Sequence, residues 1–292
     1  DQQEKIDEKS LRKLVKYQLS NGVHGLWASG TSSEFPALRQ EERVKTIQLV
    51  VDEVNGKVPV IGNVTMPSTR LTVELAKQSI GNGVSAIAAT PPYFFSHTQT
   101  EIADHYRAIR HSVDVPLWIY NIPIMHKTPV SPSTVATLAS EGVISGIKDS
   151  SGTGELLTEL HILRDNMGFD LCSTLGTSVR VGVALALGAQ GVVPALANVI
   201  PGIFVDIWNS SESSNFEKIK LLNEKVMTAL QLGLLRKPPE STQGSIFSGY
   251  KKALVELGII EFDFVTKPHK PLTTDEAKLI PSILSKLNIN NV

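Results

Sequence analysis

One lysine of the chain, Lys148, stands inside the apolar run ISGIKD, directly after Ile147. Lysine is almost never fully buried without a partner, and an apolar environment favours the neutral amine over the ammonium ion. The neutral amine is the form that attacks a carbonyl carbon and makes a Schiff base. The residue therefore indicates covalent catalysis on a carbonyl substrate. The alternative is a lysine at a solvated strand end, paired with the neighbouring Asp149.

Hydroxyl groups elsewhere in the chain could serve such a lysine. Tyr120 ends another apolar run, and a phenol can carry a proton between the amine, the carbinolamine hydroxyl and the leaving group. Thr31 and Ser32 could relay that proton to solvent, and their backbone N–H groups could bind a carboxylate. The alternatives are a core-rim aromatic residue for Tyr120 and an ordinary capping loop for residues 31–33. Only the combination predicts a site.

Seven short β-branched or apolar runs could position these residues, at 24–29, 59–64, 85–90, 116–121, 144–149, 171–176 and 191–196. Helical patterns separate the runs, as in residues 41–54, whose apolar side chains recur at helical spacing. Strands that alternate with helices pair in parallel, and continuously apolar strands are typical of sheets covered on both faces.

Two folds fit this alternation, a closed (β/α)₈ TIM barrel and an open doubly wound sheet. An open sheet that binds nucleotides usually carries a glycine-rich fingerprint after its first strand, whereas the first run here ends in GTSSEF with one glycine. We therefore predict an α/β fold of the TIM-barrel type. Its active site would lie at the carboxyl ends of the strands, where Thr31, Tyr120 and Lys148 fall.

A closed barrel needs eight strands, and the sequence offers seven. The helical segment 7–22 precedes the first run with nothing strand-like before it, so we expect the first strand upstream of Asp1, within about 10–20 further residues. After Pro201 the remaining segments indicate helices, joined by polar linkers at 236–244 and 266–271, with Thr273 or Thr274 as an N-cap. We expect residues 1–205 to form the barrel without its first strand and residues 206–292 a C-terminal helical region.

The composition argues against several classes of partner. The 292 residues carry a net charge of -1 without a basic stripe, which argues against nucleic acid or an anionic membrane. One cysteine, Cys172, excludes an internal disulfide and a cysteine-built zinc site, and we expect it to be a small buried strand residue. The chain shows no long apolar stretch, and its charged start does not resemble a signal peptide. We expect a cytoplasmic protein that acts on a small molecule.

Four motifs in order resemble those of the dihydrodipicolinate synthase / N-acetylneuraminate lyase superfamily. They are GTSSE, TPPYF, YNIP and GIKDSSG, at residues 30–34, 90–94, 120–123 and 146–152. The segments GAQGVVPALANVIP and FSGYKKALVELGII resemble the family's late glycine-rich strand and its C-terminal helical region. The resemblance therefore covers essentially the whole chain.

The resemblance implies a role for each matching residue. Lys148 matches the lysine that forms the imine with pyruvate or another 2-oxo acid, Tyr120 the acid/base tyrosine and Thr31 the relay hydroxyl. Ser32 stands where the family binds the carboxylate of the 2-oxo acid. Tyr93 matches a tyrosine that completes the relay from a neighbouring subunit, which implies a homodimer or homotetramer. No metal or organic cofactor is implied.

The chain departs from the family at positions that bear on the second substrate. Synthases that use aspartate semialdehyde carry an arginine shortly after the tyrosine motif, whereas YNIPIMHKT has Met125 there; His126 or Lys127 could substitute, or both could be solvated loop residues. Asp149 after the lysine looks more like 2-keto-3-deoxy sugar-acid and 4-hydroxy-2-oxoglutarate aldolases. Ser33 replaces the loop glycine of the family.

These departures lead to a prediction about the substrate. We expect the second substrate to meet small, hydroxyl or imidazole groups, contributed by Met125, His126, Gly176, Thr177, Val193 and Ala197. Without an arginine to pair with a second carboxylate, such a surface suits a neutral hydroxyaldehyde. We predict cleavage of a 2-keto-3-deoxy sugar acid to pyruvate and an aldehyde. Dihydrodipicolinate synthesis ranks second and 4-hydroxy-2-oxoglutarate cleavage third.

Three rival functions fit the sequence less well. A metal-dependent aldolase needs converging ligands, and the seven histidines are scattered without an HxxxH pair at a strand end. A catalytically silent sensor on the same scaffold would have lost Lys148 or Tyr120, and both are present. A phosphosugar enzyme would carry glycine-rich anion loops after the last strands, which LGTSV and ANVIPG match poorly.

Overall fold

The computed structural model describes residues 3–152, 154–236 and 242–289. Six parallel strands pair in sequence order to form one curled sheet. The strands are β1 (Leu26–Ala28), β2 (Val60–Asn63), β3 (Ala86–Ala89), β4 (Leu117–Asn121), β5 (Gly146–Asp149) and β6 (Cys172–Leu175). A seventh position in the sheet is a single parallel bridge between Leu175 and Val192.

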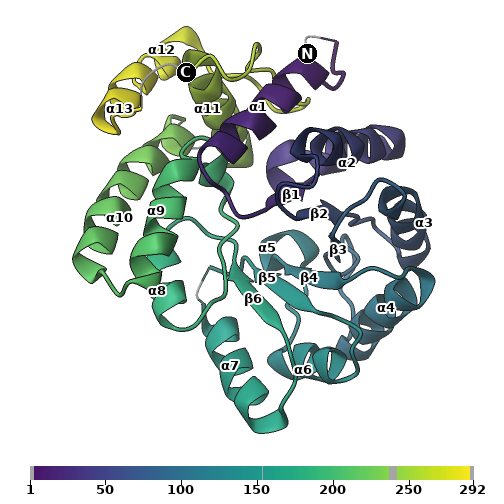
Figure 1. Ribbon diagram of the computed structural model, residues 1–292. Coiled ribbons are helices and arrows are strands. Elements are labelled where there is room, and N and C mark those ends of the chain that lie inside the picture. Colours follow the sequence, from purple (N-terminus) through teal and green to yellow (C-terminus); the bar gives the residue numbers. More distant parts are fainter. Residues whose placement is uncertain (1–2, 153, 237–241, 290–292) are drawn as a thin grey trace.

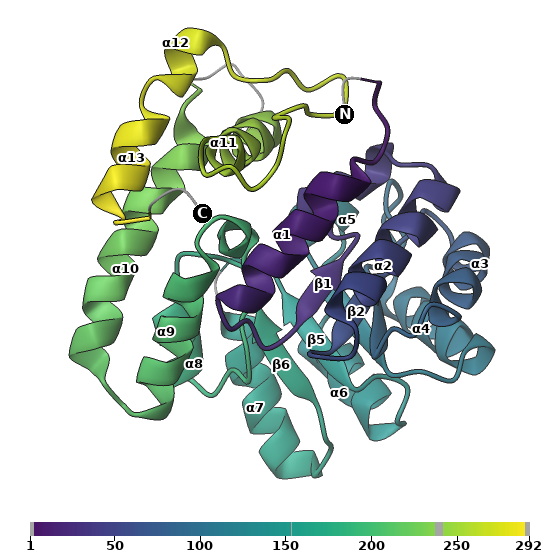
Figure 2. The same ribbon diagram turned by 45° about the horizontal axis from the view of Figure 1, so that its top comes forward.

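Helices cover the outside of this sheet, as Figures 1 and 2 show. The longer ones are α1 (Glu8–Ser20), α2 (Gln40–Val54), α3 (Thr69–Ile80), α4 (Gln99–Ser112), α6 (Pro132–Ser140), α7 (Glu155–Met167) and α8 (Val181–Ala186). Short helical turns stand at the strand ends: η1 (Thr31–Ser33), η2 (Phe35–Ala37), α5 (Pro123–His126) and η3 (Ala195–Asn198). The predicted TIM-barrel fold is confirmed.

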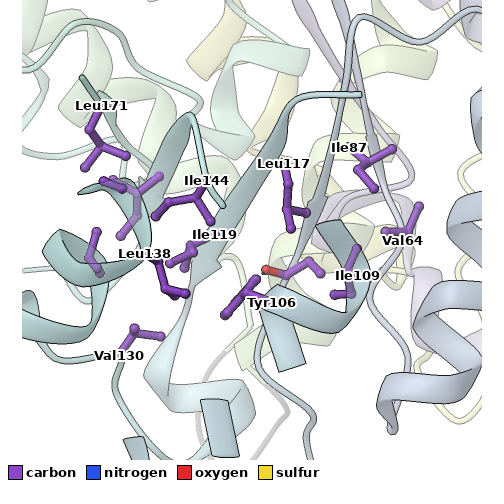
Figure 3. Close-up of a cluster of buried hydrophobic side chains, with 14 of the residues drawn as sticks. Val64, Ile87, Tyr106, Ile109, Leu117, Ile119, Val130, Leu138, Ile144 and Leu171 are labelled. Atoms are coloured by element: carbon purple, nitrogen blue, oxygen red, sulfur yellow. Dashed lines mark hydrogen bonds between the residues drawn. The ribbon is translucent and has the colours of Figure 1, made fainter. Parts of the chain in front are cut away.

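The core between strands and helices follows from the alternation of side chains along each strand. Leu117 and Ile119 of β4 point toward the helices and share one buried cluster with Tyr106 of α4 and Leu138 of α6 (Figure 3). Trp118, which lies between them, and Tyr120 after them line the interior cavity instead. Each strand therefore presents one set of side chains to the core and a second set to the interior.

The run at 191–196 differs from the prediction of a full strand. Only Val192 pairs with the sheet, and the chain turns into η3 three residues later. Pro194 explains the short pairing, because proline cannot donate to a ladder of strand hydrogen bonds. On the other side of the sheet, the described chain forms helix α1 before β1, and β1 pairs with β2 alone.

The C-terminal helices pack around a second hydrophobic cluster. They are α9 (Pro201–Glu212), α10 (Phe216–Leu230), η4 (Gln231–Leu234), α11 (Thr242–Glu256), α12 (Thr274–Ala277) and α13 (Ile280–Lys286). The cluster also takes Val181 and Leu185 from α8 and Tyr17 from α1. The boundary expected at 205/206 therefore falls inside α9, within a continuous zone of packing.

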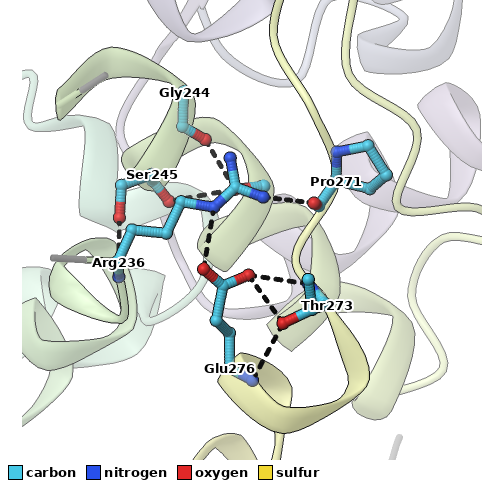
Figure 4. Close-up of polar contacts among 7 residues, drawn as sticks. Arg236, Gly244, Ser245, Pro271, Thr273 and Glu276 are labelled. Atoms are coloured by element: carbon cyan, nitrogen blue, oxygen red, sulfur yellow. Dashed lines mark hydrogen bonds and ion pairs between the residues drawn. The ribbon is translucent and has the colours of Figure 1, made fainter. Parts of the chain in front are cut away.

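Polar contacts close this C-terminal region (Figure 4). The Arg236 Nε lies 3.4 Å from a carboxylate oxygen of Glu276, and the same guanidinium donates to the carbonyl of Pro271. Glu276 also accepts the backbone N–H of Thr273, which is the N-cap of α12, one of the two threonines expected there. The last helical segment is two helices rather than one, with Pro281 in the first turn of α13. Most of the expected linker at 236–244 lies outside the described residues.

Candidate active site

Neighbouring strands bring inward side chains to one level of the barrel. The register pairs Tyr120 of β4 with Lys148 of β5, and Lys148 with Thr174 of β6. Lys148 is 7% exposed, and its Nζ atom lies 4.3 Å from the centre of the Tyr120 ring. The structure thus brings together the lysine and the tyrosine that the sequence singled out.

Asp149 takes no part in a pair with Lys148. Its Oδ1 accepts hydrogen bonds from Asn121 Nδ2 at 2.8 Å and from the Ser151 backbone at 3.1 Å, and its Oδ2 accepts from the Ser151 hydroxyl at 2.7 Å. Asn121 in turn accepts the backbone N–H of Val130 at 3.2 Å. Asp149 therefore joins the ends of β4 and β5, and no ion pair found within the described ranges involves Lys148.

The loop after β1 supplies the hydroxyls. Thr31 Oγ1 lies 2.9 Å from the Tyr120 hydroxyl, so a proton can pass between the two. Ser32 follows in the same turn and lines the cavity described below. Two non-glycine residues with left-handed backbone, Ser29 and Glu34, bracket this turn, with φ of 56° and 57°. Such conformations persist where the surroundings hold them.

Buried polar contacts hold both bracketing residues. Arg43 Nε donates to the Ser29 hydroxyl at 3.3 Å, and Asn63 Nδ2 donates to the Ser29 carbonyl at 2.8 Å. The Glu34 carboxylate accepts from Lys251 of α11 and from the N–H and hydroxyl of Thr266, both at 2.7 Å. Burial alone would raise the pKa of Glu34, but the Lys251 charge and these hydrogen bonds outweigh it, and the pKa lies below its usual range. The loop is thus fixed from the barrel on one side and from the C-terminal region on the other.

A cavity of about 1140 Å³ opens beside Lys148. Its lining includes the expected Thr31, Ser32, Tyr120, Lys148 and Val193, and also Met125, Gly176 and Ala197. Gly176 is needed for space, since a Cβ there would lie 2.8 Å from Lys148 Cε and would strike the Ser150 hydroxyl. The lysine therefore packs directly against backbone.

The mouth of the cavity near α5 is apolar. Ile122, Ile124 and Met125 line it, and Met125 occupies the position at which the family resemblance implies an arginine in synthases. Among the described residues that line the cavity there is no arginine. Among the described lining residues, the lysines besides Lys148 are Lys5 and Lys251, and Lys251 already pairs with Glu34.

The structure does not bring His126 or Thr177 to the cavity lining. His126 is buried, and its Nε2 accepts the backbone N–H of Ile122 at 2.8 Å. Burial lowers the pKa of His126 to about 4, so the ring is neutral near pH 7 and cannot replace a cationic clamp. The Thr177 hydroxyl is enclosed, without a hydrogen-bond partner in the described part of the chain.

Tyr93 also lies outside the cavity of its own chain. Its side chain is half-buried and interacts electrostatically with Arg43. Burial raises the pKa of the Tyr93 hydroxyl, and the positive charge of Arg43 opposes part of that rise. The next two residues, Phe94 and Phe95, are each 69% exposed. A role for Tyr93 at a reacting centre would therefore require a second copy of the chain.

Near Lys148 the cavity is also lined by Trp27, Trp118, Ser150 and Thr174, which the sequence did not indicate as site residues. Trp118 and Thr174 lie an even number of residues from Tyr120 and from Cys172, on the interior side of their strands. The two-residue alternation along a strand indicates their side, whereas the prediction of strands apolar on both faces does not separate interior residues from core residues. Cys172 does lie on a strand as expected, half-buried, and burial raises the pKa of its thiol.

Two further features of the described residues bear on the class of function. Within residues 3–152, 154–236 and 242–289, no group of three or more His, Cys, Asp or Glu side chains is arranged to hold a metal ion. In the same described part of the chain, no helix is both long and apolar enough to cross a membrane.

Comparison with known proteins connects this geometry to one family. The model of the dihydrodipicolinate synthetase family matches residues 1–287. A 4-hydroxy-tetrahydrodipicolinate synthase of Syntrophus aciditrophicus is 30% identical over 274 residues, which cover 94% of this chain and 90% of that protein. A protein of the same name from Rhodospirillum centenum is 34% identical over 218 residues, 74% of either chain. The crystal structure of dihydrodipicolinate synthase from Acinetobacter baumannii, complexed with pyruvate, superposes with a TM-score of 0.86 at 27% identity, covering 97% of this chain and 94% of that one.

Proposed function

Because the chain belongs to the dihydrodipicolinate synthetase family, we propose that it is a class I lyase or aldolase that binds pyruvate as a Schiff base on Lys148. The observation that carries the proposal is a buried lysine that has no carboxylate partner among the described residues and packs against Tyr120, whose hydroxyl bonds to Thr31. A lysine in this setting is suited to attack a carbonyl, and the tyrosine and threonine to move the protons.

The first stage forms the imine. The neutral Lys148 amine attacks C2 of the 2-oxo acid, and the carbonyl oxygen takes up a proton and becomes the carbinolamine hydroxyl. Tyr120 donates the proton with which this hydroxyl leaves as water, and the product is a protonated imine. Tyr120 is left as the phenolate that the second stage uses, and the Thr31 hydroxyl, 2.9 Å away, can donate a hydrogen bond to it and relay protons between it and solvent. Ser32 and the backbone of its turn bind the carboxylate.

The second stage makes or breaks a carbon–carbon bond. In cleavage, Tyr120 as phenolate removes the proton of the C4 hydroxyl, the C3–C4 electron pair moves toward the iminium nitrogen, and an aldehyde leaves. The enamine that remains is protonated at C3, and water then hydrolyses the imine to pyruvate and the free amine. In synthesis, the same enamine attacks an aldehyde. The positive nitrogen is the electron sink in both directions.

The second substrate has two candidates, each with its own support. The names of the relatives favour dihydrodipicolinate synthesis from pyruvate and aspartate semialdehyde, the second of the reactions expected from the sequence. The apolar mouth and the lack of an arginine among the described lining residues favour a neutral aldehyde, released from a 2-keto-3-deoxy sugar acid. The cleavage of 4-hydroxy-2-oxoglutarate, whose aldehyde half carries a carboxylate, gains nothing from this cavity.

Borohydride trapping tests the Schiff base. Incubation with pyruvate and borohydride should add one pyruvate-derived group to the peptide that contains Lys148. Lys148→Ala should abolish the label, and Lys77→Ala, at an exposed lysine of α3, should leave it unchanged. A label on any other lysine contradicts the proposed mechanism.

A comparison of kcat/KM for 2-keto-3-deoxygluconate with that for aspartate semialdehyde plus pyruvate decides the second substrate. A charged bidentate contact contributes about 1.5–3 kcal/mol, roughly 10- to 150-fold in binding. A preference of about tenfold or more for the semialdehyde selects synthesis and shows that some other group of the cavity binds its carboxylate. The reverse preference selects the sugar acid.

Membership of the family also leads to proposals about quaternary structure and location. We propose a homodimer or homotetramer in which Tyr93 of one copy reaches the site of another, supported by the exclusion of Tyr93 from the cavity of its own chain. The charged composition and the identity of the relatives support a cytoplasmic location.

A further inference from the structure

Two aromatic rings enclose the terminal nitrogen of Lys148. The Nζ atom lies 4.3 Å from the ring centre of Tyr120 and 4.8 Å from that of Trp27. These two rings meet edge to face with centres 5.4 Å apart, and Trp118 stands next to Trp27 with ring centres 6.3 Å apart. The lysine thus ends in a cage formed by Trp27 and Tyr120 and backed by Trp118.

Glycines provide the space that the cage needs. A Cβ at Gly30 would lie 2.9 Å from Cδ1 of Trp27, and a Cβ at Gly146 would strike the ring of Trp118. Real Cβ atoms essentially never approach other heavy atoms so closely. Each indole, like Lys148 against Gly176, therefore packs on backbone without a side chain, and its position is closely determined.

The cage acts on charge rather than on shape alone. A cation within about 6 Å of the face of a tryptophan or tyrosine is attracted by the ring quadrupole, more strongly where water is excluded. The amine that attacks the carbonyl and the enamine are neutral, whereas the iminium between them carries a positive charge on the nitrogen of Lys148. The rings therefore favour the cationic forms of this nitrogen, the iminium and the ammonium of the free lysine alike, over the neutral amine and the enamine.

Filling of space does not account for an indole at position 27. The Trp27 Nε1 is buried and has no hydrogen-bond partner among the described residues. An unpaired buried donor destabilises the folded state, and a phenylalanine or leucine would fill this part of the interior without one. What the indole adds is the aromatic face with the strongest attraction for a cation.

We propose that Trp27 is a positioning residue of the reaction. Its indole face holds the Lys148 nitrogen beside Tyr120 and stabilises the cationic iminium relative to the neutral amine. This inference rests on the proposed Schiff-base chemistry and extends it to a residue that transfers no proton and binds no substrate oxygen.

Two substitutions separate the aromatic face from the bulk. Trp27→Leu keeps an apolar side chain and removes the face, whereas Trp27→Phe keeps a face. At pyruvate well below saturation, we expect the fraction of imine trapped by borohydride and kcat/KM to fall about tenfold in Trp27→Leu, which is about 1.4 kcal/mol, and less than about threefold in Trp27→Phe. Equal trapped fractions and equal kcat/KM in the two variants would overturn the proposal. Such a result would mean that the aromatic face contributes nothing beyond the space that the side chain fills.

The same experiment separates this inference from the function on which it rests. If the unaltered chain traps no pyruvate, the Schiff-base proposal fails. If it does, and Trp27→Leu traps as much, only the role of Trp27 fails.

Fluorescence provides a second test that does not depend on the folding of Trp27→Leu. Conversion of the amine to an imine 4.8 Å from the indole should change the tryptophan emission of the unaltered chain when pyruvate is added. The change should disappear in Lys148→Ala and shrink in Trp27→Phe, in which Trp118 and Trp208 remain. A change of the same size in Trp27→Phe, or no change in a chain that traps pyruvate, would overturn the proposal.

Discussion

At the scale of single residues, the hydroxyl and the ring of Tyr120 perform separable tasks. The ring lies against the Lys148 nitrogen, and the hydroxyl bonds to Thr31 at 2.9 Å. Tyr120→Phe keeps the first contact and removes the second. We expect kcat to fall about 10²- to 10⁴-fold, as is typical for loss of an acid/base group, with trapping of pyruvate slowed but not abolished. Stopped-time borohydride trapping and steady-state kinetics measure the two quantities. An unchanged kcat would remove Tyr120 from the mechanism.

The absence of a side chain at Gly176 leaves room for the reacting lysine. In Gly176→Ala the new methyl group would meet the Ser150 hydroxyl and Lys148 Cε, so one of these side chains must move. Overpacking of this kind typically costs about 1–3 kcal/mol, and here it displaces the reacting lysine. We expect a loss of kcat/KM of about tenfold or more. Gly81→Ala is the matched control, because nothing lies within 4 Å of a Cβ there and its φ is negative. Equal activity of the two variants would contradict this account.

Some residues of the candidate site could be predicted because their residue type is unusual at their place in the sequence. Lys148 and Tyr120 could be found because a lysine in an apolar run and a tyrosine at a strand end are unusual. Trp27 and Trp118 could not be distinguished from ordinary core residues by their type. Only the alternation of side chains along β4, counted from Tyr120, places Trp118 on the interior side. From the sequence, His126 is predicted to bind substrate because it follows Met125. Its ring instead accepts the backbone N–H of Ile122 and does not line the cavity.

At the scale of elements, the loop that carries Thr31 and Ser32 depends on α11. Glu34, at the end of this loop, has a side chain that is 3% exposed and pairs with Lys251. Lys251→Met leaves a buried carboxylate with only the two hydrogen bonds from Thr266, and we expect a loss of about 3 kcal/mol of unfolding free energy together with a higher KM for pyruvate. Glu34→Gln removes the charge and should cost less, about 1 kcal/mol.

A double-mutant cycle in urea measures the coupling between Glu34 and Lys251. If the effects of the two substitutions add, the residues do not act as a pair. If stability falls and the KM for pyruvate does not change, the pair is structural and does not position the loop.

The pair also predicts a dependence of stability on acid. The pKa of Glu34 in the folded chain lies below its usual value of 4.5, because Lys251 and Thr266 favour the ionised form despite its burial. The ionised form therefore contributes stability above about pH 4.5, and this contribution is lost as pH falls through the lower pKa of the folded state. We expect the stability difference between the unaltered chain and Glu34→Gln to shrink below pH 4.5. Glu41→Gln, at an exposed glutamate of α2, is the control for the substitution itself.

The order of strands and helices could be predicted because it is periodic in the sequence, while several details depend on contacts between distant segments. Pro194 limits the seventh run to one bridge, and Pro281 lies in the first turn of a separate last helix. The link from Glu34 to Lys251 spans 217 positions of the chain and leaves no local signal. The C-terminal helical region predicted from the sequence thus contacts, through Lys251, the loop that carries Thr31 and Ser32.

At the scale of the whole molecule, the surface near the mouth of the cavity carries exposed aromatic side chains. The rings of Phe94 and Phe95 stand 5.1 Å apart, and Ile124 is 80% exposed. Phe94 has a left-handed backbone with φ of 87°, and the Lys127 nitrogen lies 5.4 Å from its ring centre. Exposed apolar groups gathered in this way mark contact surfaces between proteins.

A charged substitution tests whether this surface joins two copies. We expect Phe95→Asp to lower the mass in solution by dissociation and to lower kcat in proportion, because Tyr93 would be withdrawn from the partner site. Sedimentation velocity and activity at equal protein concentration measure the two effects. Phe216→Asp, at an exposed phenylalanine of α10, tests a second surface and should not lower kcat in the same way. A dissociated chain with full activity would contradict the arrangement.

Complementation shows whether Tyr93 acts in the site of another copy. Tyr93 does not line the cavity of its own chain, so its hydroxyl can complete a proton relay only across an interface. Lys148→Ala should be inactive, and Tyr93→Phe should lose about 100-fold in kcat. In a mixed dimer of these two variants, the subunit that retains Lys148 receives an intact Tyr93 from its partner. If subunits exchange at random, about half of the dimers are mixed and about a quarter of all sites are complete.

We therefore expect an equal mixture, unfolded and refolded together, to recover about a quarter of the activity of the unaltered chain. Each variant refolded alone is the control. Activity no greater than the sum of the separate variants would show that Tyr93 acts within its own chain or not at all.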